Sequence, residues 1–412
     1  MGTRGCVPGT RWTAIQTEII SRIADVRADE WNTLIGEDDP FLEHAFLNAL
    51  ELSGSVSEDA GCVPRLVLAR HRGTLQGAVP LYLKTNSYGE FIFDWAWADA
   101  AHRNGIRYDP KLVAAIPFTP ATGHRLLIAP GADREAVTGA LLDAVGDVAT
   151  KERASSVHFL FCTPEEKERL GAAHYAPRLS MQFHWENRPE RPFTDFDDYL
   201  STFRSRNRKQ VRKERAAAAA HGLTFRVATG AELDDTDWAA LQQFYSANVA
   251  RHHGIEYLQP AFFDIVRETF AHRLVATLAY RGRTPVAGTV NFEKGRHIYG
   301  RYWGCLGDFE MLHFELCYYQ LIERAIARRC TRFEAGAQGE HKLKRGLAPA
   351  FTHSAHFIEH PGLRAAIASF VEREAVAVED GLREYAEHTP FHHGPAPGDP
   401  HPRPPTADGE DA

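Results

Sequence analysis

The sequence predicts an α/β (α+β) protein of two domains, in which helices alternate with strands. The chain has 412 residues, which is long for one compact core, and 44% of them are hydrophobic, as in folded domains. Segments with helical periodicity alternate with segments of strand character along most of the chain. Pro189 and Pro192 follow a strand-like segment and predict a boundary near residue 187. We therefore expect domains at residues 12–187 and 188–388.

The first predicted domain combines three helices with several strands. Residues 64–84 alternate apolar and polar positions around Gly73, which predicts a hairpin, and residues 155–162 predict a further strand. Residues 89–105, GEFIFDWAWADAAHRNG, mix large rings with acids. We expect a loop there, because this mixture is costly to bury without partners. Apolar residues recur at helical spacing in residues 28–37, 40–54 and 132–153.

The second predicted domain begins with a long basic helix. Residues 202–222 are rich in arginine, lysine and alanine, which favour helices, and Gly222 provides the stop. Residues 273–304 predict three strands joined by tight turns at Gly282 and Gly295. Residues 389–412 are rich in proline and polar residues and predict a disordered tail. The other elements predicted are helices over residues 237–250, 260–272 and 312–329 and a strand over residues 331–338.

Charge and composition exclude several classes of protein. The formal net charge of -7 argues against broad, sequence-blind binding of nucleic acid. The N-terminal residues lack the apolar run of a signal peptide, and no stretch approaches the ~18 apolar residues of a membrane span, so we expect a cytoplasmic protein. The six cysteines include no C-x-x-C pair and predict reduced thiols. His353 and His356 lack a third ligand at useful spacing, so no metal site is predicted.

Several sequence blocks carry a resemblance to a known family. They are PFLEHAFLNALE (40–51), FDWAWADA (93–100), SRNRKQVRKER (205–215), YGRYWG (299–304), LHFELCYYQ (312–320) and GAQGEHKLKRGLAP (336–349). Together they resemble the FemAB-like proteins of peptidoglycan biosynthesis or recognition, a branch of the GNAT acyltransferase superfamily. The resemblance implies two GNAT-like domains in tandem, each with a mixed central sheet flanked by helices, and an active groove at their junction. It also implies transfer of an acyl or aminoacyl group from an activated donor to an amine.

The strand YGRYWG and the loop after it match the place where GNAT proteins hold their donor. In the GNAT plan the donor lies where two neighbouring parallel strands part. Arg301 and Gly304 keep part of the pattern that holds the phosphates of CoA, and both are predicted donor-binding residues. Asp308 and Glu310 depart from that pattern, because two acids beside a diphosphate are unfavourable. The resemblance to a CoA site is thereby weakened.

The stretch GAQGEHKLKRG, residues 336–346, predicts a loop that faces a ligand. Its glycines allow close backbone approach and positive φ, while Lys342, Lys344 and Arg345 supply cations. The family resemblance implies that Lys342 or Lys344 holds a phosphate or carbonyl of the substrate. The alternative is an exposed surface turn, in which glycine and charge are also common.

The basic helix presents a row of arginines. Arg204, Arg208, Arg212 and Arg215 follow one another at spacings of four, four and three, which places them on one helical face. Arginine binds phosphate through two parallel hydrogen bonds, so Arg208 and Arg212 are predicted donor-binding residues. The row fits a tRNA acceptor end, a nucleotide-linked cell-wall precursor or the phosphates of CoA. The alternative is a solvated helix face.

Amide formation needs a group that accepts a proton and a group that donates one. Glu315 is the favoured base and Glu334 the next, while His313 also lies beside the predicted donor strand. Glu340 and His341 are further candidates on the following loop.

Tyr302, with Tyr299 as its alternative, is predicted to protonate the leaving group. On the acceptor side we expect Asp94, Trp95, Trp97 and Asp99, because carboxylates recognise amines and indoles stack on rings or cations. The alternative for these four residues is a packed loop between the domains.

The sequence thus predicts an N-acyltransferase whose donor is acyl-CoA or aminoacyl-tRNA, with no tightly bound cofactor. The arginine row and the altered phosphate loop favour aminoacyl-tRNA, whereas the general GNAT plan and the acidic net charge favour acyl-CoA. The acceptor is expected to be a small-molecule or cell-wall-precursor amine. The alternative from another class is a non-catalytic protein that recognises cell-wall precursors with the same fold, because fold alone does not define function.

Overall fold

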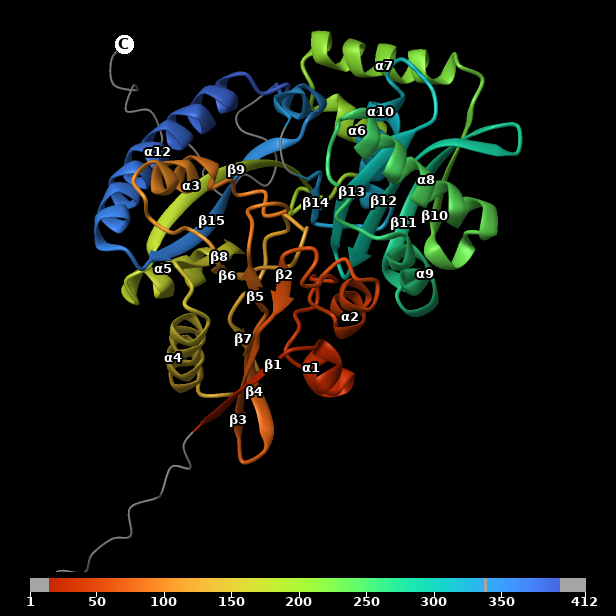
Figure 1. Ribbon diagram of the computed structural model, residues 1–412. Coiled ribbons are helices and arrows are strands. Elements are labelled where there is room, and N and C mark those ends of the chain that lie inside the picture. Colours follow the sequence, from red (N-terminus) through yellow and green to blue (C-terminus); the bar gives the residue numbers. More distant parts are fainter. Residues whose placement is uncertain (1–14, 337–338, 393–412) are drawn as a thin grey trace, which may run out of the picture.

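The computed structural model describes residues 15–336 and 339–392 (Figure 1). Within these ranges one sheet of eleven strands runs through both halves of the chain, in the order β10-β11-β12-β13-β14-β9-β15-β8-β6-β5-β2. A second sheet of four strands has the order β1-β3-β4-β7. No helix in the described ranges has the length and apolarity needed to cross a bilayer.

The strands are β1 (Gln16–Ile20), β2 (Cys62–Pro64), β3 (Leu66–His71), β4 (Thr74–Val79), β5 (Leu81–Lys84), β6 (Lys111–Ala114), β7 (Leu127–Ile128), β8 (Ser156–Cys162), β9 (Ala176–Glu186), β10 (Thr224–Thr229), β11 (Leu274–Arg281), β12 (Thr284–Lys294), β13 (His297–Cys305), β14 (Arg332–Glu334) and β15 (Ala348–Ile358). The helices are α1 (Ala28–Asn32), α2 (His44–Leu52), α3 (Trp95–Arg103), α4 (Arg134–Glu152), α5 (Pro164–Ala172), α6 (Phe196–Ser201), α7 (Ser205–Ala219), α8 (Asp235–Arg251), α9 (Pro260–Thr269), α10 (Leu312–Phe314), α11 (Gln320–Ala327) and α12 (Pro361–Glu387). A π-helix (Glu315–Tyr319) joins α10 to α11, and short 3-10 helices lie at Ile23–Asp25, Gly230–Glu232, Ala271–Arg273 and Glu340–Arg345.

Both halves of the large sheet follow the same plan. In the C-terminal half β12 is antiparallel to β13, β13 is parallel to β14, and β14 is antiparallel to β9. In the N-terminal half β5, β6, β8 and β15 repeat this order and these directions. The strands β9 and β15 pair antiparallel at the centre of the sheet. Each half therefore ends with a strand that inserts beside the other half.

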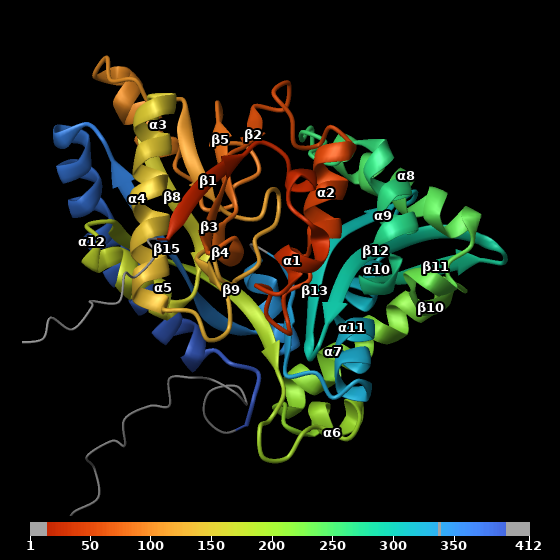
Figure 2. The same cartoon turned by 90° about the horizontal axis from the view of Figure 1, so that it is seen from below.

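Helices cover both faces of the large sheet (Figures 1 and 2). Every residue of β8 is buried, which explains why its sequence is nearly all apolar. Val157 packs toward α4, whereas His158 on the opposite face meets Trp97 of α3, with ring centroids 6.4 Å apart. Helix α2 of the N-terminal half packs against α9 and β12 of the C-terminal half through Phe46. One aromatic core thus holds the two halves together.

Most predicted elements are confirmed, with small shifts of their ends. The hairpin turns at Arg72 and Gly73, both at positive φ, as two-residue hairpin turns require. The long basic helix predicted over residues 202–222 is α7, and the separate short helix α6 ends just before it, at Ser201. The single helix predicted over residues 312–329 contains the π-helix, where the Leu316 carbonyl accepts a hydrogen bond from the Thr277 hydroxyl.

Two sequence predictions are wrong in part. Residues 95–103 of the expected loop form helix α3, because the acid before it, Asp94, is neutralised by Lys111. The tail was predicted to be disordered from residue 389, but Phe391 is buried against Phe203. The remaining residues of the tail, 393–412, lie outside the described residues. The domain boundary near residue 187 stays a prediction, and β15 crosses it to pair with β8.

Candidate active site

The parallel strands β13 and β14 pair over three residues and then separate. Tyr299 and Glu334 form the last pair, and β13 continues for six further residues, Gly300–Cys305. A bulge at Arg301, which has no partner in the register with β12, bends β13 at this point. Alternate backbone N–H and C=O groups of this segment point to the open edge, where a ligand can bind them. The parting strands expected from the resemblance are thus present.

A cavity of about 220 Å³, the donor cavity, lies at this open edge. Its walls are β12, β13, the helical segment from α10 through the π-helix, and the 3-10 helix 340–345. The backbone of Gly300 to Trp303 forms one side, and Lys342 lies among the residues of the other. The cavity therefore brings the open strand edge and a cation together.

Lys342 is only 3% exposed and lines the donor cavity. Its Nζ donates a hydrogen bond to the carbonyl of Gly336, with 2.8 Å between the two atoms. Burial lowers the pKa of Lys342 to about 8, because the charged form loses its hydration. Lys344, two residues further, is exposed on the surface. Of the two lysines left open by the sequence, the structure brings Lys342 to the open strand edge.

A cluster of rings forms the rest of the donor cavity. His313 contacts Trp303 edge to face, with ring centroids 5.1 Å apart. The hydroxyl of Tyr318 lies 3.0 Å from Nε2 of His341. Burial, with the neighbouring His341, lowers the pKa of His313 to about 4, so its imidazole is neutral at pH 7. Cys317 also lines the cavity, and burial raises the pKa of its thiol. The side chain of Glu340 lies outside the described part of the structure.

A second cavity of about 350 Å³, the junction cavity, adjoins the first and is built by both halves of the chain. Phe91 and Pro120 come from the N-terminal half, and Tyr245 and Tyr257 from the C-terminal half. Residues Arg301 to Trp303 line both this cavity and the donor cavity. The two cavities therefore meet at the bulge of β13, at the junction where the sequence predicted the active groove.

Arg301 joins the two halves at this point. Its Nη2 donates to the carbonyl of Phe118, which also accepts a bond of 3.3 Å from the hydroxyl of Tyr302. Phe118 holds a positive φ of 57°, a conformation that costs a bulky residue energy and persists only where its surroundings impose it. Arg301, predicted to bind the donor, and Tyr302, predicted to protonate the leaving group, are thus both engaged with Phe118.

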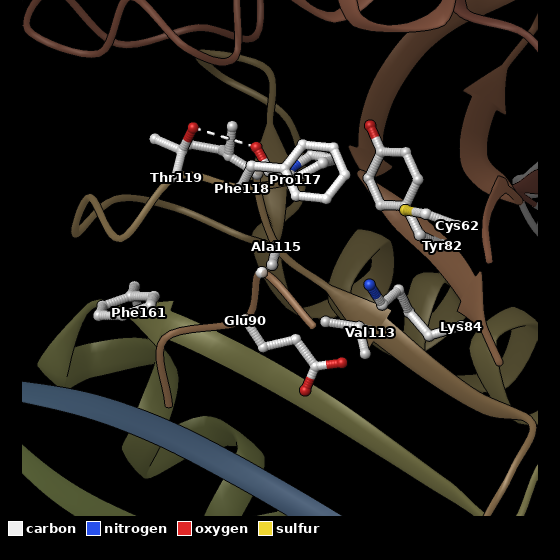
Figure 3. Close-up of a pocket in the computed structure, with 12 residues that line it drawn as sticks. Cys62, Tyr82, Lys84, Glu90, Val113, Ala115, Pro117, Phe118, Thr119 and Phe161 are labelled. Atoms are coloured by element: carbon white, nitrogen blue, oxygen red, sulfur yellow. Dashed lines mark hydrogen bonds between the residues drawn. The ribbon is translucent and has the colours of Figure 1, made fainter. Parts of the chain in front are cut away.

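The N-terminal half has a corresponding opening beyond β6, and Figure 3 shows residues that line it. Phe118 and Phe161 border it together with Glu90 and Lys84. Its volume is about 20 Å³, room for about one water molecule. Of these two corresponding openings, only the one in the C-terminal half therefore has room for a substrate.

Glu315, the favoured base, is buried and does not line the donor cavity. Its two oxygens accept hydrogen bonds from Arg215 at 3.0 and 2.9 Å, and Gln320 adds a third at 2.7 Å. Arg345 is engaged in the same way, because it donates two bonds to Glu214 at 3.0 and 2.8 Å. These pairs attach α7 to the π-helix and to the 3-10 helix 340–345. Both groups stabilise the cavity walls.

Two further predicted residues, Glu334 and Gly304, lie on the parting strands but do not line the donor cavity. Glu334 ends β14 and is buried with its Oε2 unpaired among the described residues, and burial raises its pKa to about 7. Gly304 lies under α8, where a Cβ would overlap the carbonyl oxygen of Phe244. Its lack of a side chain permits this close helix–strand contact.

The four predicted acceptor residues do not form one site. Asp94 is buried and accepts bonds from Lys111 and, at 2.7 Å, from Tyr108. Trp97 is buried with the Arg178 guanidinium 4.7 Å from its ring centre. Trp95 and Asp99 are exposed, and Asp99 forms an ion pair with Arg103.

The arginine row on α7 divides between the inside and the surface. Arg215 faces the π-helix, as described above, whereas Arg208 is half-buried. Arg212 is exposed and forms one ion pair, at 3.3 Å, with the exposed Asp197. Arg206, Lys209 and Lys213 are also exposed. The outer face of α7 is therefore strongly basic.

The structure also shows residues that the sequence analysis missed. Cys317 and Tyr318 reach the donor cavity from the π-helix, and Asn291 reaches it from β12. The π-helix that brings Cys317 and Tyr318 there leaves no clear sequence signal. In the described ranges, no group of three or more His, Cys, Asp or Glu side chains is placed to hold a metal ion.

The fold is similar to that of FemX, as comparison with solved structures shows. FemX has 12% sequence identity and a TM-score of 0.51, with 83% of this chain and 98% of FemX covered. L-PGS from Bacillus licheniformis has 13% identity and a TM-score of 0.48, covering 82% of this chain and 98% of L-PGS. A tandem GNAT protein from the clavulanic acid biosynthesis pathway has 12% identity and a TM-score of 0.42, covering 84% and 99%.

The sequence profile of the FemAB-like family, described as peptidoglycan biosynthesis/recognition, matches residues 22–393. The chain therefore belongs to the FemAB-like family. Family membership supports a role in peptidoglycan biosynthesis or recognition. Among curated proteins, no match to the sequence is found.

Proposed function

We propose that the protein transfers an aminoacyl group from aminoacyl-tRNA to an amine and forms an amide at the open edge of β13. The observation that carries this proposal is the position of Lys342, a buried cation beside backbone groups that no described strand pairs on that side. An ester carbonyl bound there would meet N–H donors and a positive charge as its oxygen becomes negative. Such prearranged groups are the main source of catalysis in acyl transfer.

The reaction joins the acceptor nitrogen to the ester carbonyl. The amine attacks, the C–N bond forms, the ester C–O bond breaks, and the ribose hydroxyl leaves. His313 is neutral at pH 7 and can take the proton that the attacking nitrogen loses. Lys342, with its pKa lowered to about 8, is largely protonated at pH 7 and can give a proton to the leaving oxygen.

The surroundings of the donor cavity favour tRNA over CoA as the donor. The outer face of α7 carries Arg206, Lys209, Arg212 and Lys213, and its inner face is bonded to the walls of the cavity. A basic helix beside an ester site suits the phosphates of a tRNA. The loop after β13 instead exposes the acids Asp308 and Glu310 before a helix of three residues. The diphosphate of CoA would be repelled there.

A transfer assay tests this function. The purified protein is incubated with a mixture of ³H-aminoacyl-tRNAs or with ³H-acetyl-CoA, each with a panel of amines, and amide products are counted. We expect transfer from tRNA, a loss of at least 100-fold in Lys342→Met, and little change in Lys344→Met. Transfer from acetyl-CoA alone would overturn the choice of donor. Binding of amines without any transfer, unchanged by Lys342→Met, would favour a recognition protein.

A further inference from the structure

The junction cavity continues into a third cavity of about 580 Å³, the outer cavity. The two share Ile255 and Tyr257, and the ring of Tyr257 stacks on Phe118 with centroids 5.1 Å apart and planes 6° apart. The outer cavity is bordered by the segment after α2 and by the segment before α9. A continuous groove, the acceptor groove, therefore runs from the bulge of β13 to the surface on the side away from the donor cavity.

The charges along the acceptor groove are unfavourable for phosphate. Among the residues that line its two cavities, Asp59 and Glu256 are acids, and Arg301 is the single base. Neither acid has an ion-pair partner within the described residues, whereas the guanidinium of Arg301 is engaged with the carbonyl of Phe118. A ligand phosphate would meet two carboxylates there, while a ligand ammonium would be attracted.

The other polar groups of the outer cavity are neutral and small. Ser53, Ser57, Asn86 and Gln259 line it, and Ser57 and Asn86 each donate one bond to a nearby backbone carbonyl. Hydroxyl and amide groups of this kind exchange hydrogen bonds with ligand hydroxyls and amides. The lining therefore matches a hydroxyl-rich ligand.

Aromatic side chains gather at the mouth of the groove. Tyr88, Phe93, Trp95 and Ile255 are 45%, 46%, 54% and 48% exposed, and they are four of the eight large apolar side chains exposed in the described ranges. The ring of Trp95 lies 5.9 Å from Tyr88 and 6.1 Å from Phe93, centroid to centroid. A concentration of exposed rings at one cavity mouth marks a binding surface. Flat rings next to hydroxyl-binding groups suit the C–H faces of sugar rings.

We propose that the acceptor groove binds an amine-bearing carbohydrate that carries no phosphate, and presents its amine to the donor ester at the bulge of β13. This inference rests on the proposed transfer and names its acceptor. The sugar nitrogen forms the amide, the ester C–O bond breaks, and the proton lost by the amine leaves on the ribose hydroxyl. The acids attract the amino groups, the serines and amides bind hydroxyls, and the aromatic mouth holds the sugar ring.

Direct binding tests this proposal without any donor. Four probes are titrated by calorimetry and by tryptophan fluorescence: a glucosamine tetramer, its fully N-acetylated form, UDP-N-acetylglucosamine and dodecylamine. We expect the glucosamine tetramer to bind at least 10-fold more tightly than the other three. The double variant Asp59→Asn, Glu256→Gln is expected to lose that preference. Tyr88→Ala or Trp95→Ala is expected to lower the affinity for both tetramers about 10-fold. Leu306→Ala, an exposed apolar residue outside the groove, serves as the matched control and is expected to bind normally.

The outcomes separate this inference from the proposed function. Tighter binding of the sugar nucleotide, or binding of dodecylamine alone, would overturn the inference. If the glucosamine tetramer binds but accepts no aminoacyl group, the inference stands and the transferase proposal fails. If other amines accept the group while no sugar binds, the transferase stands and the inference fails. All three groove variants change surface side chains, and thermal unfolding checks that each is folded.

Discussion

The half-buried Arg215 of α7 and the buried Glu315 of the π-helix form a two-pronged ion pair, with N···O distances of 3.0 and 2.9 Å. The same guanidinium also bonds to Glu323, at 2.7 Å. The pair fixes the segment that carries His313 and Tyr318 into the donor cavity. A carboxylate held in this way stabilises the site and has no free oxygen for proton transfer.

Removing this carboxylate should cost stability more than chemistry. Glu315→Ala leaves Arg215 without its most buried partner, and breaking a buried pair costs about 3 to 5 kcal/mol. Urea denaturation is expected to show a loss toward the lower figure, because Glu323 still neutralises Arg215. Transfer by the folded fraction should stay within about 10-fold of normal. A complete loss of transfer with unchanged stability would restore Glu315 as the base.

Gly304 should tolerate no side chain. A Cβ at this position would overlap the backbone of Phe244, so α8 or β13 must move. We expect Gly304→Ala to lower the free energy of unfolding by about 3 kcal/mol or more, as overpacking against rigid backbone does. Gly139→Ala is the matched control, because it lies in α4 with open space around it and should gain up to about 1 kcal/mol. Equal effects of both changes would contradict the close contact.

Transfer should decline in alkaline solution as Lys342 loses its proton. Burial lowers the pKa of Lys342 to about 8, so the protonated form required here is present below pH 8 and disappears above it. The rate with saturating acceptor should fall about 10-fold per pH unit above this value. Lys342→Arg keeps its charge at all these pH values, so any residual activity should lack the alkaline decline. A wild-type profile flat to pH 10 would exclude this role.

Stability should fall in mild acid because of two buried histidines. Nδ1 of His158 lies 2.7 Å from Nδ1 of His356, and each Nε2 lies 2.8 Å from a serine hydroxyl, Ser156 and Ser354. Burial holds the pKa values of both histidines well below 6.5. The positive charges of Lys111 and Arg178 lower both pKa values further, whereas Asp94 raises the pKa of His356.

The unfolded chain therefore binds protons below pH 6.5 that the folded chain excludes. The free energy of unfolding should decline by up to about 1.4 kcal/mol per pH unit for each histidine as the pH falls. Changing both histidines to Asn should reduce the slope of the free energy of unfolding against pH by an amount that corresponds to about two protons. An unchanged slope in that double variant would show that other groups cause it.

The outer face of α7 should govern the salt dependence of tRNA binding. Arg206, Lys209 and Lys213 are exposed and face away from the buried Glu214 pair. Changing the three to Gln should weaken tRNA binding and make the slope of log K against log salt less negative by about 2 to 3. The control is Arg373→Gln, Arg383→Gln on the exposed face of α12. An equal loss of tRNA affinity in the α7 variant and in the α12 control would indicate a general effect of charge.

Local patterns in the sequence predict most elements but not where their side chains point. Lys342 and Lys344 are equivalent in the sequence, and the turn of one short helix decides which is buried. Asp94 and Trp97 are unusual in composition, yet their partners Lys111 and Arg178 lie far along the chain. The engagement of Glu315 has the same origin, since Arg215 reaches it across 100 residues.

The parting of β13 and β14 was expected from family resemblance, whereas its cause is visible only in the structure. The bulge at Arg301 depends on pairing with β12, and no single-strand pattern encodes it. The mouth of the acceptor groove combines Trp95 and Ile255, which lie too far apart in the sequence for any local pattern to include both. Contacts between distant segments therefore define most of the candidate site.

The exchange of β9 and β15 makes the two halves mutually dependent for folding. A fragment cut at residue 187 would expose one side of β8 and both sides of β9, since their partners β15 and β14 lie in the missing piece. Bare strand edges of this kind aggregate. We therefore expect that the two halves cannot be expressed as separate folded proteins, although they share the same order and direction of strands.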